Sequence, residues 1–79
     1  MKLILASASW CGPCQTIKSR LQTENLLEKV EVREPENDHA FFKDNNIKSV
    51  PRLLVMDGDT VVEMIHGSED IIQRIRDAS

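Results

Sequence analysis

The sequence lacks any apolar run of about 20 residues, the length that a membrane-spanning helix needs. Its apolar N-terminal stretch, MKLILA, is too short for the apolar region of a secretory signal peptide. An excess of basic residues is missing too, since 10 Lys and Arg stand against 13 Asp and Glu and the formal net charge is -3. Without a basic stripe, a protein has little with which to neutralise phosphates. These absences predict a cytoplasmic protein with neither a membrane nor a nucleic acid as its partner.

Internal repeats, low-complexity tracts and linkers are absent as well, so the 79 residues are expected to form one domain, 1–79. A chain of this length lies near the lower limit for independent folding. The apolar fraction of 41% and the charged fraction of 29% are typical of a globular protein rather than a disordered one. We expect it to be a monomer.

Cysteine is scarce: the chain has only Cys11 and Cys14, both within the stretch SWCGPCQ. A structural zinc site takes four ligands, usually in two closely spaced pairs. The two histidines, His39 and His66, lie far apart in the sequence and do not form such a pair. We therefore expect no metal and no cofactor in one monomer, and a metal shared between two monomers remains an alternative.

A purely structural disulfide is a weak explanation for this pair of cysteines, because closing so short a loop removes little entropy from the unfolded chain. A redox pair suits the local chemistry better. At a strand-to-helix junction, free backbone N–H groups and the helix dipole favour a thiolate on Cys11. Gly12 permits a tight approach and Pro13 stiffens the turn, while Cys14 lies deeper and ionises less. This asymmetry suits Cys11 to attack a disulfide and Cys14 to resolve the product.

The pattern of apolar residues and turn signals predicts an α/β protein in the order strand–helix–strand–helix–strand–strand–helix. The first strand–helix–strand unit should be parallel and right-handed, and the Asp57-Gly58 turn predicts an antiparallel hairpin. The result is a four-stranded mixed sheet with three helices. The expected strands are 2–6, 29–34, 52–56 and 60–65. The first expected helix has Pro13 in its first turn, and the second begins near Asp38 and ends at Asn45-Asn46. The third follows Ser68, which is expected to be its N-cap.

The motif WCGPC resembles the active-site motif of thioredoxins, and its strand–motif–helix context is similar to the thioredoxin-like superfamily. The stretch SVPR, Ser49 to Arg52, stands where this superfamily carries a cis-proline that faces the dithiol. The resemblance implies that the Val50–Pro51 bond is cis and that the Val50 backbone pairs with an extended substrate. We expect Cys11, Cys14 and Pro51 to be the catalytic residues. The residues expected to bind the substrate are Trp10, Gly12, Pro13, Val50, Arg52, His66 and Gly67.

The chain departs from the thioredoxin pattern at several positions. Leu5 stands where thioredoxins carry a buried Asp, which removes the usual proton acceptor for Cys14. Ser7 replaces a tryptophan that commonly packs beside the motif. The size and element order are similar to those of glutaredoxins, and HGSED (66–70) resembles the Gly-Gly-x-Asp-Asp stretch that holds glutathione in that family. There His66 replaces the first Gly and crowds the approach to the helix end.

The resemblance implies a minimal thioredoxin/glutaredoxin-like fold and a thiol–disulfide oxidoreductase that reduces disulfide-containing proteins, as the small redoxins that donate electrons to ribonucleotide reductase do. We expect a thioredoxin reductase to be its electron donor rather than glutathione. A glutathione-dependent glutaredoxin is the alternative, for which Lys48 would supply a cation. The second alternative is a metal-bridged binding module without enzymatic activity.

Overall fold

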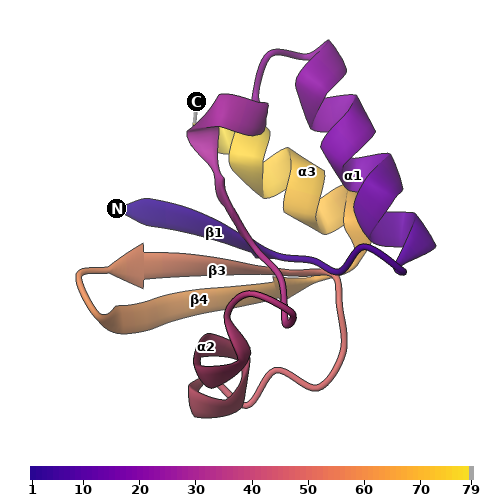
Figure 1. The fold of residues 1–79 in the computed structure, drawn as a ribbon. Helices are drawn as coiled ribbons and strands as arrows, with labels where there is room; N and C mark the ends of the chain where they lie inside the picture. The colour runs from indigo at the N-terminus through magenta and orange to yellow at the C-terminus, as the bar shows by residue number, and fades with distance from the viewer. Residues whose placement is uncertain (79) are drawn as a thin grey trace.

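Four strands form one mixed sheet in the computed structural model, which describes residues 1–78 (Figure 1). The strand order is β2-β1-β3-β4; β1 pairs in parallel with β2 and antiparallel with β3, which pairs antiparallel with β4. This arrangement confirms the predicted sheet. The strands are β1 (Lys2–Ala6), β2 (Glu31–Arg33), β3 (Arg52–Asp57) and β4 (Thr60–His66).

Helices cover both faces of this sheet. The helices α1 (Gly12–Thr23) and α3 (Ser68–Asp77) lie on one side, and α2 (His39–Asp44) lies on the other (Figure 1). Alternation along β1 explains the two layers, because successive side chains of a strand point to opposite faces. Leu3 and Leu5 join the apolar cluster beneath α1 and α3, whereas Ile4 and Ala6 join the cluster beneath α2.

Several boundaries differ from those that the sequence predicts, and β3 and β4 each extend one residue further, to Asp57 and His66. The strand predicted at 29–34 is shorter in the structure. A 3-10 turn, η1 (Leu27–Lys29), includes Lys29, the first residue of the predicted strand, and β2 begins at Glu31. The predicted N-cap Ser68 is instead the first residue of α3, and Gly67 occupies the cap position with φ 89°. A left-handed φ is readily adopted by glycine, so Gly67 lets the chain turn from β4 into α3 at this point.

An ion pair joins the ends of α1 and α3. The Arg76 guanidinium donates from Nε and Nη2 to the two carboxylate oxygens of Glu24, over 2.7 and 2.6 Å. These hydrogen bonds hold the pKa of the Glu24 carboxyl below its ordinary value of 4.5. A carboxyl whose pKa is lowered on folding stabilises the folded state above its unfolded pKa, and this contribution is lost as the pH falls through the lowered value.

We therefore expect Glu24→Gln to lower the melting temperature modestly at neutral pH, because an exposed pair contributes little. The difference from the wild type should shrink once the pH falls below 4.5. Thermal melts followed by circular dichroism across this pH range measure it. Glu28→Gln removes an exposed carboxylate from η1 and is the matched control; an equal loss in both variants contradicts the assignment.

Candidate active site

The two cysteines lie at the start of α1 and are joined by a disulfide. Cys11 is the N-cap residue, in extended backbone conformation, and Cys14 lies in the first turn, with a Cα–Cα distance of 5.3 Å between them. Gly12 and Pro13 open the helix, where the missing N–H of proline leaves no intrahelical bond unmade. The sequence of this turn thus holds both sulfur atoms within bonding reach.

The two sulfurs have different surroundings. Cys11 is 6% exposed at the surface end of the helix, whereas Cys14 is 0% exposed and shares the buried stripe of α1 with Ile17 and Leu21. The backbone N–H of Cys14 donates to Cys11 Sγ over 3.3 Å, and the first turn of α1 contains no acidic residue. These N–H groups and the helix dipole favour negative charge on Cys11 Sγ once the disulfide is reduced.

The segment before β3 lies against this disulfide. The Val50–Pro51 peptide bond is cis, as the resemblance implies. The Val50 carbonyl oxygen lies 3.9 Å from Cys11 Sγ, and the Val50 side chain packs on the small cluster of Ala8, Cys11 and Cys14. Within residues 1–78, the N–H of Val50 has no hydrogen-bond partner. This leaves an unpaired backbone N–H close to the sulfur.

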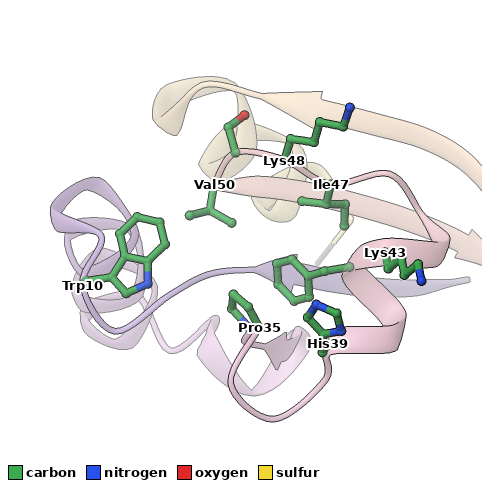
Figure 2. A pocket seen from close by; sticks show the side chains of 9 residues that line it. Trp10, Pro35, His39, Lys43, Ile47, Lys48 and Val50 are labelled. Atoms are coloured by element: carbon green, nitrogen blue, oxygen red, sulfur yellow. The ribbon is translucent and has the colours of Figure 1, made fainter.

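A groove begins beside Trp10, whose side chain is 73% exposed. It encloses about 220 Å³ and runs between α2 and the segment before Pro51 (Figure 2). Sequence reasoning placed Trp10 and Val50 here but missed the residues of the opposite wall. His39, which the sequence gives no reason to place at the site, is exposed and lines the groove. The other missed residues are Pro35, Phe42, Lys43, Ile47 and Ser49.

Two hydrogen bonds fix the loop that carries Trp10. Gln15 donates from Nε2 to the Ala8 carbonyl oxygen over 3.1 Å, and Ser9 Oγ donates to a Glu36 carboxylate oxygen over 3.0 Å. The backbone N–H of Glu36 itself and the Ser9 hydroxyl lower the pKa of the Glu36 carboxyl. The second hydrogen bond ties the active-site loop to the segment that leads into α2.

The remaining predicted residues lie at the adjoining ends of β3 and β4. Arg52 is half-buried; it donates to Ser49 Oγ over 3.1 Å, and its Nε is buried without a partner. His66 is exposed and pairs with Arg52 in the β3–β4 register. Paired residues of a sheet share a face, so His66 stands with Arg52 on the face that α2 covers. Gly67 follows at the start of α3.

The chain departs from the thioredoxin pattern at Leu5 and Ser7, and neither side chain is a carboxylate. Leu5 is 0% exposed and packs in the cluster that contains Ile17 and Leu21. Ser7 is also fully buried, and its hydroxyl has no hydrogen-bond partner within residues 1–78. The buried stripe of α1 that carries Cys14 thus continues into an apolar cluster that contains Leu5.

Metal ligands do not gather in the part of the chain that the structure describes: no three His, Cys, Asp or Glu residues of 1–78 form a group that could hold an ion. Among the same residues, no helix has both the length and the apolar character to cross a membrane.

A pair of cysteines that forms a disulfide at a helix start, beside a cis-proline on this fold, defines a thiol–disulfide oxidoreductase. The chain belongs to the thioredoxin family, whose model, Thioredoxin, matches residues 1–77. A comparison with curated protein sequences finds no match.

Solved structures of thioredoxins are similar to this chain in fold. Thioredoxin 1 of Thermosipho africanus has a TM-score of 0.70 at 13% identity, and the match covers 99% of this chain and 93% of that one. The thioredoxin of Trypanosoma brucei brucei has a TM-score of 0.72 at 20% identity, with 98% and 73% covered. A complex of ferredoxin:thioredoxin reductase with thioredoxin f2 matches at 0.69 and 22% identity, with 98% and 77% covered. Identities this low establish the shared fold alone.

Proposed function

We propose that the protein is a protein disulfide reductase in which Cys11 is the nucleophile and Cys14 the resolving cysteine. The observation that supports this assignment is the difference between the two sulfurs: Cys11 reaches the surface and accepts the Cys14 N–H, while Cys14 is fully buried. A surface thiolate can attack a substrate, whereas a buried thiol can react only with its neighbour.

In the proposed cycle, the Cys11 thiolate attacks one sulfur of a substrate disulfide, and that bond breaks to release one substrate thiolate. Cys14 then loses its proton and attacks Cys11 Sγ, which releases the second substrate thiolate. The substrate takes up two electrons and two protons, and the protein is left with the Cys11–Cys14 disulfide. Val50 would hold the substrate backbone and Pro51 would face the reacting sulfur. The further substrate contacts we propose are Trp10, Gly12, Pro13, Arg52, His66 and Gly67.

A thioredoxin reductase is the electron donor that we propose for regenerating the dithiol. The Gly12-Pro13 pair between the cysteines is the thioredoxin choice, and the thioredoxin f2 among the structural neighbours was crystallised with a reductase. In the cell we place the protein in the cytoplasm as a monomer, with target enzymes such as ribonucleotide reductase, because a reducing compartment keeps such a dithiol active.

Glutathione is the second candidate donor, since three of its potential contacts are present. The N-terminus of α3 at Gly67 suits one carboxylate, the free Val50 N–H suits the peptide backbone, and the exposed Lys48 suits the other carboxylate. Against it, the His66 ring stands directly before the cap residue, where glutaredoxins carry a Gly.

We expect insulin disulfides to be reduced much faster with NADPH and thioredoxin reductase than with glutathione, glutathione reductase and NADPH. His66→Gly should raise the glutathione-dependent rate, because the ligand backbone gains room. Consumption of NADPH measures both rates, and Thr60→Gly, at the opposite end of β4, is the control for placing a glycine in this strand away from the α3 terminus. Rapid turnover with glutathione and none with the reductase would assign the protein to the glutaredoxin type instead.

A further inference from the structure

The groove beside the dithiol has an apolar centre and polar ends. Figure 2 shows Trp10 at one end and Lys43 at the other, with the side chains of Ile47 and Val50 between them, and Phe42 also lines the groove. Phe42 and Ile47 belong to the cluster beneath α2, so the floor of the groove is continuous with the core. A floor of this kind accepts one apolar side chain of an extended segment.

The charges around this floor are all of one sign. Lys43 on α2 and Lys48 before Val50 are both exposed, line the groove with His39, and form no ion pair within residues 1–78. Within residues 1–78, no carboxylate lines the groove. The whole chain has a net charge of -3, so the charge of the groove lining is opposite in sign to that of the chain as a whole.

The acidic side chains nearest in the sequence do not line the groove. Glu36 accepts the Ser9 hydroxyl, and Asp38 lies 3.5 Å from the Arg33 guanidinium, whose carbon also lies 4.9 Å from the centre of the Phe41 ring. Asp44 follows Lys43 in α2 and is not among the lining residues. Among residues 1–78, therefore, no carboxylate pairs directly with either lysine.

We propose that Lys43 and Lys48 make the enzyme select substrates whose reactive disulfide lies in an extended, acidic segment. This inference rests on the proposed disulfide reduction and names its substrate class: an apolar side chain enters the groove over Phe42 and Ile47, while nearby carboxylates meet the two ammonium groups. Complementary charge of this kind raises the rate of encounter and excludes partners of the same sign. The reacting cysteine of the substrate then lies beside Val50 and Cys11.

Matched peptides test the selection directly. Each peptide carries one cysteine in a mixed disulfide with a chromogenic aryl thiol and one leucine; one series has glutamates around the cysteine and the other has glutamines at the same positions. We expect the wild-type enzyme to reduce the glutamate peptides with a kcat/KM about fivefold higher, the size that two exposed ion pairs can supply. The preference should shrink as salt is added, because the pairs are exposed.

The double variant Lys43→Gln, Lys48→Gln should bring the ratio of the two rates to about one. Lys29→Gln changes the net charge in η1, away from the groove, and should keep the wild-type ratio. Equal rates on both series by the wild type, or the same loss of preference in Lys29→Gln, would overturn the inference while disulfide reduction itself stands. Failure to reduce either series would instead count against the proposed function.

Discussion

Cys11→Ser is expected to abolish disulfide reduction completely, whereas Cys14→Ser is expected to stop the reaction at a mixed disulfide with the substrate. Cys11 is the more exposed of the two cysteines, at 6% against 0%, and lies beside the unpaired backbone edge of Val50, so its loss removes the first attack. Cys14 is fully buried and can act only on a bond already formed to Cys11. Insulin turnover measures the first effect, and mass spectrometry under non-reducing conditions measures the second.

Each variant is the control for the other, because both lack the internal disulfide and both carry one serine in the same turn. A difference between them therefore reports which sulfur meets the substrate. Turnover by Cys11→Ser equal to that of the wild type would refute the redox function. A mixed disulfide that forms on Cys14 rather than on Cys11 would reverse the two roles and leave the function in place.

The sequence predicts most of the fold because its signals are local. A buried strand before WCGPC, the alternating strand after it and the Asp57-Gly58 turn set the order of the elements, and the sheet has the predicted pairing. The errors fall at boundaries, where two conformations compete. Leu27–Lys29 forms a 3-10 turn in place of the first strand residue, and Gly67 takes the cap because its φ of 89° suits the turn into α3.

The dithiol and the cis bond are predicted by a short motif, but the groove is not. His39, Phe42 and Lys43 line it from α2, whose sequence shows one apolar face and several charges like any short surface helix. The residues of α2 that border the groove are decided by how this helix packs relative to the active-site loop, and that packing cannot be seen in the sequence of α2. The hydrogen bond from Ser9 to Glu36 is of the same kind, since 27 residues separate its partners. Of the basic lining residues, only Lys48 lies close to Val50 in the sequence.

Leu5→Asp is expected to destabilise the protein far more than Glu24→Gln. Leu5 is 0% exposed, lies in β1 between Val32 of β2 and Leu53 of β3, and packs with Ile17 of α1. An aspartate there loses the apolar contacts and leaves a carboxyl in an apolar layer, which together cost about 3 kcal/mol or more at neutral pH. Burial disfavours the charged form, so the pKa of this carboxyl should lie above its unfolded value of about 3.9.

The sign of the pH effect follows from that shift. Below pH of about 3.9 the carboxyl is neutral in both states and only the lost packing counts; above it, ionisation favours the unfolded chain increasingly until the pH reaches the raised pKa. Leu5→Asn, a side chain of similar size without a titratable group, is the control, and its loss of stability should not follow this curve. Urea unfolding of both variants across the pH range gives the difference.

The same carboxyl lies beneath the stripe of α1 that carries Cys14, so the rate of the resolving step in single-turnover reduction should gain a new pH dependence in Leu5→Asp and not in Leu5→Asn. Parallel stability curves and parallel rate profiles for the two variants would show that an acid at position 5 is neither buried nor able to exchange a proton with Cys14.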